Sequence, residues 1–268
     1  MAGATSRPPS SNPTGFIGAM PDLPLQPRLQ GSTGDPEIRH YPVAISVEQL
    51  ASGWLRSENA ADGSTVIVDH EIGGRQRLGI PWKVPPERSI ACAVALHTLV
   101  RAEDEALLWT VALVAAARAA GVRPGWPDLL FDDGGRVVGS VSLEVRFGPG
   151  TVDTAIVSLR LDAAALDTPL RASTEVRRSM AVRFSSAVQD TATTAGSDAD
   201  KLRAEYNQTS LLIGSRVRAL LLPQGEVRGI ATGVSGSGLL VVKSATGMIE
   251  QLNPISVLRV ELVSSARS

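Results

Sequence analysis

The pattern of hydrophobic and polar residues divides the chain into a longer mixed part and a shorter part made of strands. Apolar residues recur at helical spacing over residues 47–56, 103–120 and 174–188, which predicts three helices. Alternating or continuous apolar runs predict strands over residues 65–68, 88–99, 128–131, 137–145 and 154–161. Five further short runs between residues 211 and 263, separated by glycine-containing turns, predict a small antiparallel barrel of SH3-like size.

The segments around these elements predict the domain boundaries. Residues 1–42 contain eight prolines, and such a composition buries too little apolar surface to fold, so we expect a flexible tail. A larger domain is expected over 43–189. A polar linker with a short helix is expected over 190–210, before the barrel at 211–263.

Composition limits the function classes. The 268 residues carry a formal net charge of −1, which gives no electrostatic reason to expect nucleic acid as a partner. No apolar run reaches the ~18–20 residues of a membrane span, and the N-terminus lacks the basic-then-apolar pattern of a secretory signal. The single Cys92 excludes an internal disulfide framework. We therefore expect a cytoplasmic protein that binds neither nucleic acid nor membrane.

The stretch HEIGGRQRLGIPW, residues 70–82, follows the strand predicted at 65–68. Glycines let backbone N–H groups approach an anion, and the guanidinium groups of Arg75 and Arg77 supply paired donors and positive charge. The pattern therefore fits a loop that holds a phosphate. A structural glycine-rich turn with surface arginines explains the same residues, and the stretch alone leaves both interpretations open.

A second stretch, GWPDLLFDDGGRVVGSVSLEV at residues 125–145, predicts a hairpin around the turn DDGG. Together with the order of the other segments, the two stretches resemble the biotin–protein ligases and the related lipoate–protein ligases. That family's first signature reads roughly Gly-Arg-Gly-Arg-x-Gly-x-x-Trp, and the residues in register are Gly74, Arg75, Arg77, Gly79 and Trp82. The second begins Lys-Trp-Pro-Asn-Asp, and the matching residues are Trp126, Pro127, Asp128, Gly135 and Glu144. The resemblance spans roughly residues 60–262.

The resemblance implies an α+β fold, in which a mixed sheet flanked by helices precedes the SH3-like barrel. It also implies a reaction in which biotin, or a lipoate-type acid, is joined to AMP with ATP and Mg²⁺ and passed to a lysine of a carrier domain. Arg75 and Arg77 would pair with the phosphate and carboxyl region of the acyl-adenylate, and Asp128 would lie near the Mg²⁺. The expected ligand-binding residues are Glu71, Gly73, Gly74, Gln76, Gly79, Trp82 and Trp126.

Several family positions carry other residues here. The two lysines of the second signature are replaced by Gly125 and Val137, and the glutamine that contacts biotin is Glu71. No Ser-Thr-Asn element is found upstream of Thr65, where the family begins its site. Removing one preorganised cation from such a site typically costs ~10²–10³ in rate, so the missing lysines argue against catalysis. The nearest cations in the sequence are Lys83, Arg123 and Arg136.

Two functions therefore remain open. One is a divergent ATP-dependent ligase that attaches biotin or a lipoate-type acid to a carrier lysine, with Arg75, Arg77 and Asp128 as its catalytic residues. The other is a catalytically depleted relative that uses the same fold to bind a ligand or to dock a carrier domain. A biotin or lipoyl carrier domain is the expected protein partner, and the chain could also form a homodimer.

Overall fold

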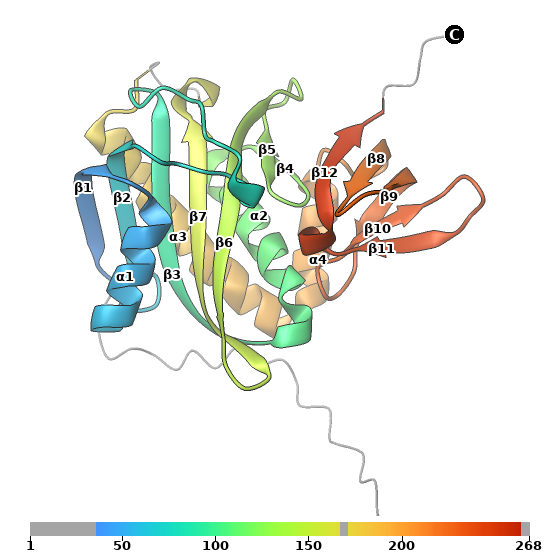
Figure 1. The fold of residues 1–268 in the computed structure, drawn as a ribbon, viewed down its shortest axis with the longest axis horizontal. Helices are drawn as coiled ribbons and strands as arrows, with labels where there is room; N and C mark the ends of the chain where they lie inside the picture. Colours follow the sequence, from blue (N-terminus) through green and yellow to red (C-terminus); the bar gives the residue numbers. More distant parts are fainter. Residues whose placement is uncertain (1–35, 167–170, 264–268) are drawn as a thin grey trace, which may run out of the picture.

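The computed structural model describes residues 36–166 and 171–263. They form a larger domain built on a seven-stranded sheet and a smaller C-terminal domain built on a five-stranded sheet (Figure 1). The elements of the larger domain are β1 (Ile38–Ala44), α1 (Val47–Glu58), β2 (Thr65–Glu71), β3 (Ser89–Arg101), α2 (Ala106–Ala120), β4 (Arg123–Gly125), β5 (Leu129–Phe131), β6 (Val137–Phe147), β7 (Thr151–Asp162), α3 (Thr174–Ser197) and α4 (Ala199–Thr209). Those of the C-terminal domain are β8 (Arg216–Leu221), β9 (Glu226–Val234), β10 (Leu240–Lys243), β11 (Ile249–Leu252) and β12 (Val257–Leu262).

The larger sheet is mixed, with strand order β1-β2-β3-β7-β6-β5-β4. Strand β1 pairs with β2 in parallel, whereas the remaining neighbours pair antiparallel. The C-terminal sheet has the order β11-β10-β9-β8-β12 and is antiparallel throughout. The expected fold class is thus confirmed: an α+β domain with a mixed sheet and flanking helices, followed by a small SH3-like β domain.

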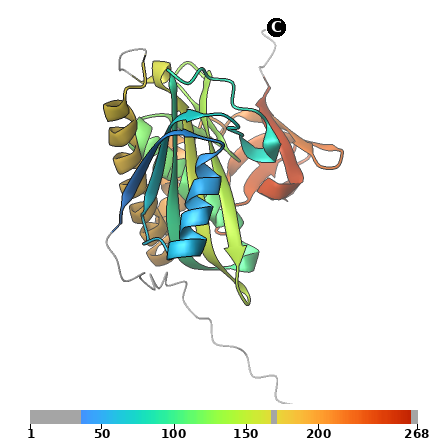
Figure 2. The same ribbon diagram turned by 60° about the vertical axis from the view of Figure 1, so that its left-hand side comes forward.

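Helices cover both faces of the larger sheet because successive strand residues point to opposite sides. On β3, Ile90, Cys92 and Val94 belong to the core shared with α2 and α3, whereas Ala91 and Ala93 belong to the core under α1. The small alanine side chains let α1 lie close to the sheet. Figure 2 shows the sheet between α1 on one side and α3 on the other. We call the side that carries α1 the α1 face.

The ends of the helices follow ordinary capping rules. Ser46 precedes α1, and its hydroxyl accepts the N–H of Gln49 at 3.3 Å. Gly121 ends α2 in the left-handed region, at φ +69°, where an L side chain would be strained. The expected helices at 47–56 and 103–120 therefore begin and end close to their predicted bounds.

Some expected boundaries are wrong. Residues 38–42, assigned to a flexible tail, belong to β1; residues 1–35 lie outside the described residues. Residues 190–197, expected to form a linker, continue α3, because Thr191 and Ala195 are buried against the core. The predicted loop also begins later, since His70 and Glu71 complete β2. Within the described ranges, no helix is long and apolar enough to cross a membrane.

Candidate functional site

The segment between β2 and β3, residues 72–88, crosses the α1 face of the sheet (Figure 1), and we call it the Gly/Arg loop. Backbone hydrogen bonds fold it back on itself: the N–H of Trp82 donates to Gly74 O at 2.9 Å, and that of Gln76 to Ile80 O at 2.7 Å. The indole N–H of Trp82 donates to Ser89 Oγ at 2.8 Å. The shape of the loop is therefore determined by contacts within the protein.

A cavity of about 570 Å³ lies under this loop. Five of the residues expected at the site line it: Gly73, Arg75, Gln76, Arg77 and Gly79. The opposite wall comes from other elements, and Glu144 is its only residue that the two sequence signatures included. It includes Ser46 and Glu48 at the start of α1, Ser142 and Glu144 on β6, and Trp109 on α2.

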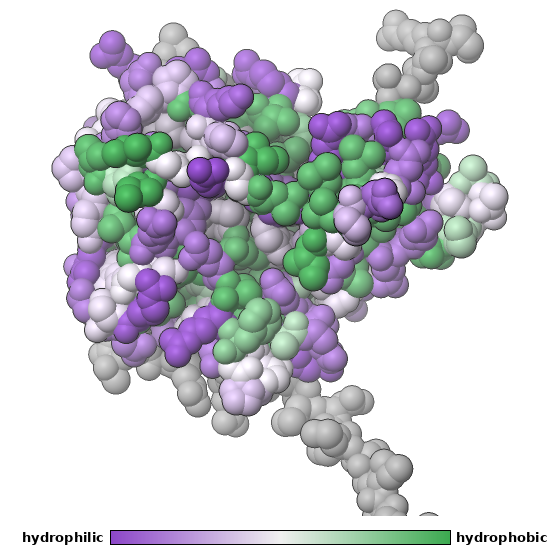
Figure 3. All heavy atoms as spheres, in the orientation of Figure 1, coloured by the Kyte–Doolittle hydropathy of each residue, from purple (hydrophilic) through white to green (hydrophobic). Residues whose placement is uncertain are grey.

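The rim of this cavity is apolar. Four large apolar side chains around it are exposed: Ile45 (63%), Ile72 (69%), Leu78 (47%) and Ile80 (48%). Two of them, Ile45 and Leu78, also line the cavity. Figure 3 shows hydrophobic residues gathered on this side of the molecule, near the end of β1 and beside the C-terminal domain. Exposed apolar groups of this kind are typical of a contact surface.

A buried arginine lies behind the cavity wall that Glu48 and Ser142 form. Arg160 of β7 places its guanidinium between Glu48 of α1 and Glu71 of β2, and we call these three residues the Arg160 triad. Its Nη1 and Nη2 lie 2.6 and 2.7 Å from the Glu48 oxygens, and its Nε and Nη2 lie 2.8 and 2.7 Å from those of Glu71. The side chains of Arg160, Glu48 and Glu71 are only 1%, 9% and 3% exposed.

Neighbouring donors complete the hydrogen bonding of the triad. Ser46 Oγ and Ser142 Oγ donate to Glu48 at 2.6 and 2.7 Å, and the N–H of Val47 donates to Glu71 at 2.9 Å. Burial would raise the pKa of Glu48, but the hydrogen bonds and charge of Arg160 and the two serine hydroxyls outweigh it and lower that pKa to about 2. The Glu48 carboxylate can therefore stay ionised inside the protein.

Gly74 of the loop lies directly over the triad. A Cβ atom at this position would overlap the Glu71 carboxylate and would lie 3.3 Å from Arg160 Nε. Only glycine therefore allows the loop backbone to approach so closely. Glu71 and Gly74, both expected at the site, do not line the cavity itself but lie against Arg160 behind its wall.

Arg77 connects the loop to the C-terminal domain. Its Nε donates to Asp128 at 3.1 Å, its Nη1 to the carbonyl groups of Pro254 and Val257 at 3.1 and 2.8 Å, and its Nη2 to that of Leu258 at 2.8 Å. The Arg77 and Asp128 side chains are 8% and 10% exposed. Four of the five N–H groups that a guanidinium offers are therefore used within the protein.

The ion pair with Arg77 also involves Asp128, the residue expected near the Mg²⁺. Burial raises the pKa of Asp128, while the charge and hydrogen bond of Arg77 act in the opposite direction. In the described part of the chain, no group of three or more His, Cys, Asp or Glu residues could hold a metal ion. In this structure the Asp128 carboxylate is paired with the Arg77 guanidinium, so binding of Mg²⁺ to Asp128 would require that pair to open.

Trp126, one of the expected ligand-binding residues, is 1% exposed and does not line the cavity under the loop. Its backbone N–H donates to Tyr206 Oη at 3.0 Å, and its indole N–H donates to Gly238 O at 3.1 Å. It therefore packs between α4 and the C-terminal domain, where it contributes to the junction of the two domains.

Among the described residues, none of the nearby cations Lys83, Arg123 and Arg136 reaches the cavity in place of the two missing lysines. A Cβ on Gly125 would overlap the ring of Phe131, and Val137 is 47% exposed. Arg123 donates to carbonyl groups of residues 209 and 210, and Arg136 pairs with Asp132. Lys83 is exposed and does not line the cavity.

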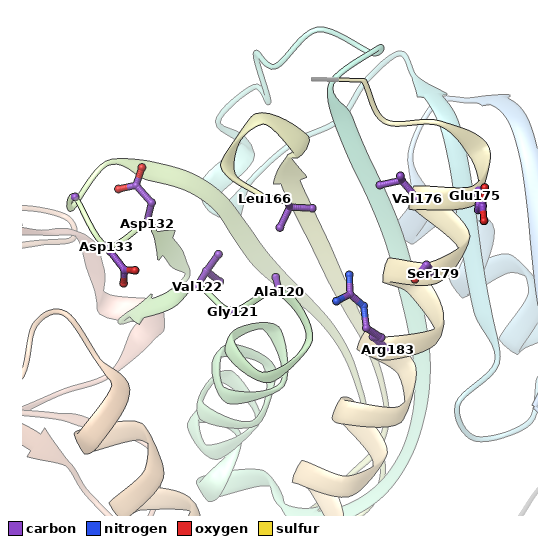
Figure 4. A pocket seen from close by; sticks show the side chains of 11 residues that line it. Ala120, Gly121, Val122, Asp132, Asp133, Leu166, Glu175, Val176, Ser179 and Arg183 are labelled. Atoms are coloured by element: carbon purple, nitrogen blue, oxygen red, sulfur yellow. The ribbon is translucent and has the colours of Figure 1, made fainter. Parts of the chain in front are cut away.

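A second cavity, of about 730 Å³, lies on the other side of the larger domain. Figure 4 shows it between Asp132 and Asp133 of the β5–β6 hairpin and Glu175, Ser179 and Arg183 of α3. It contains no residue of either sequence signature apart from the hairpin turn. The cavity under the Gly/Arg loop is therefore the candidate site.

Sequence reasoning missed Arg160 and Glu48. An arginine inside the apolar run TAIVSLRL was the available signal, because a charged residue is rarely buried without a partner. Glu48 lies upstream of Thr65, in the region where no family element was found, although Ser46 and Glu48 do contribute to the site there. Identifying Glu48 as a partner required the placement of α1 on the sheet, which no local pattern gives.

Comparisons with known proteins agree with this architecture. Residues 212–257 match the family profile "Biotin protein ligase C terminal domain". Over 204 residues, the chain is 29% identical to the biotin–[acetyl-CoA-carboxylase] ligase of Mycobacterium tuberculosis, an alignment that covers 67% of this chain and 73% of that protein.

Solved structures extend the likeness to the fold. Biotin protein ligase from Aquifex aeolicus, in complex with biotin and ATP, has a TM-score of 0.62 at 16% identity, covering 85% of this chain and 99% of that chain. The biotin acetyl coenzyme A carboxylase synthetase from Helicobacter pylori, with bound biotinylated ATP, has a TM-score of 0.55 at 15% identity, covering 81% and 100%. At these identities the likeness concerns the fold alone. In sequence, in domain order and in fold, the chain is therefore similar to the biotin–protein ligases, as its two signatures indicated.

Proposed function

We propose that this protein is a biotin–protein ligase-like protein that binds a carboxylic acid under its Gly/Arg loop without converting it to an acyl-adenylate at the rate of a ligase. The observation that carries this proposal is the environment of Arg77. Its guanidinium is held by Asp128 and three carbonyl groups of the C-terminal domain. Only one of its N–H groups is left for a phosphate.

The remaining charges support the same proposal. Adenylation brings a carboxylate against a phosphate, and preorganised cations carry most of that step. Gly125 and Val137 occupy the lysine positions, and neither Arg123 nor Arg136 lines the cavity. Arg75 is exposed, lines the cavity and donates to Gly79 O at 2.9 Å. One guanidinium of this kind can bind a carboxylate, but it provides little of the charge that adenylation needs.

A divergent ligase is the second candidate. It is favoured by Arg75 at the cavity and by the likeness to a named biotin–[acetyl-CoA-carboxylase] ligase. In that case ATP and Mg²⁺ are cosubstrates, biotin or a lipoate-type acid is the substrate, and a carrier domain is the acceptor. The apolar rim around Ile72, Leu78 and Ile80 offers a contact surface for such a domain in either case.

One assay separates the two candidates. The purified protein is incubated with ATP, Mg²⁺ and either biotin or lipoate, and pyrophosphate release and acyl-adenylate are measured. We expect no turnover above the protein-free background, together with acid binding detectable by calorimetry. Turnover that disappears in Arg77→Ala would establish a ligase and overturn the proposal.

A further inference from the structure

The Arg160 triad is more elaborate than a structural ion pair requires. All five N–H groups of the guanidinium are used: four of them donate to Glu48 and Glu71, and the second N–H of Nη1 points to Ser142 Oγ at 3.5 Å. Moving three charged groups out of water is costly, and apolar residues of similar size are often as stabilising or more so. Stability alone therefore does not account for a guanidinium at this place.

The residues around Arg160 form a receptor for a flat group that is rich in N–H donors. Two carboxylates face it, each in a two-point arrangement, and they come from two separate elements, α1 and β2. Both are held in place by donors of their own, among them Ser46 Oγ and the N–H of Val47. A planar group with several N–H bonds in a fork, such as a guanidinium or a cyclic urea, matches this geometry.

The floor around the triad has additional polar groups. Ser140 lies directly opposite Arg160 in the β6–β7 register, and Ser158 lies two residues before it on β7, so both point to the α1 face. They are 1% and 0% exposed, and in the described part of the chain their hydroxyl groups have no hydrogen-bond partner. Buried hydroxyl groups of this kind are uncommon in a purely structural environment.

The receptor is part of the cavity under the Gly/Arg loop. Glu48 and Ser142 line that cavity, and Gly74 of the loop lies against Glu71 and Arg160. A ligand that entered beside Arg75 and extended inward would therefore meet Glu48 and, behind it, the guanidinium of Arg160. In this structure the Arg160 side chain fills the space behind Glu48 and Ser142.

We propose that Arg160 is the specificity-determining residue of this cavity: its guanidinium occupies the subsite for a planar N–H donor head, so the protein takes carboxylic acids that lack such a head and excludes those that carry one, biotin with its cyclic urea included. This inference rests on the proposed function for the acid bound beside Arg75. The occupation of the inner subsite by Arg160 can be tested separately from it.

The first test uses methylguanidinium, a free copy of the end of the arginine side chain. Arg160→Ala removes the guanidinium and leaves Glu48 and Glu71 in place. We expect 10 mM methylguanidinium to raise the Tm of Arg160→Ala by about 3–5 °C, the size expected for a ligand with a Kd near 1 mM. The wild type and Arg88→Ala, which loses an arginine paired with Asp162 at the end of β7 and outside the cavity, should show no such rise.

The second test uses biotin and a double variant. It leaves fewer unpaired negative charges than Arg160→Ala does. In Arg160→Ala/Glu71→Gln the inner subsite is open and one carboxylate becomes an amide. We expect calorimetry to show at least about tenfold tighter biotin binding to this variant than to the wild type, because one good hydrogen-bonded contact is worth a factor of this size. The wild type should bind pentanoate, an acid without a planar head, in preference to biotin.

Each result bears on one part of the inference. Equal or tighter biotin binding by the wild type, or a Tm of Arg160→Ala that methylguanidinium leaves unchanged, would overturn the role of Arg160. If Arg160→Ala is unfolded, refolding with and without methylguanidinium decides: recovery only with it supports the proposal, and no recovery in either case overturns it. Absence of any acid binding by the wild type would refute the proposed function, while the methylguanidinium result would still decide the role of Arg160.

Discussion

Arg160 and Glu48 form a two-point ion pair between the centre of the sheet and the first turn of α1, with N–O distances of 2.6 and 2.7 Å. The two residues are 112 positions apart in the chain. Through this pair and the adjacent pair with Glu71, one side chain of β7 determines how α1 and the end of β2 meet the sheet. The Arg160 triad, which lies behind the wall of the candidate site, therefore also joins α1 and β2 to the sheet.

Replacing Arg160 with methionine should destabilise the protein by about 3–5 kcal/mol, because it leaves two buried carboxylates without their partner. Urea unfolding followed by circular dichroism measures this change. Arg136→Met is the matched control, since Arg136 is 71% exposed and pairs with Asp132 at the surface; we expect little change there. Similar decreases in the free energy of unfolding in the two variants would show that the buried pair contributes no more to stability than the surface pair.

The stability of the protein should fall with pH through Glu48. Its folded pKa of about 2 lies below the ordinary value of 4.5, so the ionised form stabilises the folded state. That contribution, about 3 kcal/mol from a pKa difference of this size, is complete above about pH 5 and is lost as the pH falls from about 5 to about 2. The difference in unfolding free energy between the wild type and Glu48→Gln should therefore shrink by about 3 kcal/mol between pH 7 and pH 2, and a constant difference would contradict the assignment.

Arg77→Ala should free the Gly/Arg loop from the C-terminal domain. The change removes the hydrogen bonds to Pro254, Val257 and Leu258 and leaves Asp128 unpaired, so residues 73–82 should exchange their amide hydrogens faster. Hydrogen exchange followed by mass spectrometry resolves this segment. Arg75→Ala is the control, since Arg75 is exposed and its one hydrogen bond to a carbonyl stays inside the loop. Equal exchange in the two variants would mean that Arg77 does not hold the loop.

Gly74→Ala should displace the loop, because the new Cβ would overlap the Glu71 carboxylate. We expect a loss of stability of about 1–3 kcal/mol, typical of overpacking at a closed site, together with faster amide exchange in residues 73–82. Gly53→Ala in α1 is the matched control. A Cβ there meets nothing within 4 Å, and alanine favours the helix by about 1 kcal/mol over glycine, so that variant should be slightly more stable. A stable Gly74→Ala variant would show that the loop does not rest on the triad.

The sequence predicts those parts of the fold that local patterns determine. The helix at α2 ends at Gly121, and the hairpin between β5 and β6 turns at DDGG, as expected. Strand β1 was missed because it is stabilised by parallel pairing with β2, which is not encoded in its own residues. The polar run at residues 190–197 has no helical apolar pattern apart from the buried Thr191 and Ala195, so its helical state depends on the core it contacts.

The candidate site likewise has a part that local sequence patterns predict and a part that they do not. The loop residues that line the cavity could be found because glycine and arginine have a recognisable spacing. The partners of Arg77 lie 51 to 181 positions away in the chain, and those of Arg160 lie 89 and 112 positions away. Only the placement of α1 and of the C-terminal domain determines them. Whether an arginine is available to a ligand is therefore a tertiary property, which the sequence signature alone does not contain.

The two-sided pairing of Arg160 also has a consequence for how this chain can change over evolution. Loss of Arg160 alone leaves the buried carboxylates of Glu48 and Glu71 without their partner. Loss of either glutamate alone leaves Arg160 paired with only one carboxylate. Substitutions at Glu48, Glu71 and Arg160 are therefore strongly non-additive, and most single steps pass through a less stable protein. Opening the space that Arg160 fills without leaving a buried unpaired charge therefore requires coordinated replacement of at least two of the three residues.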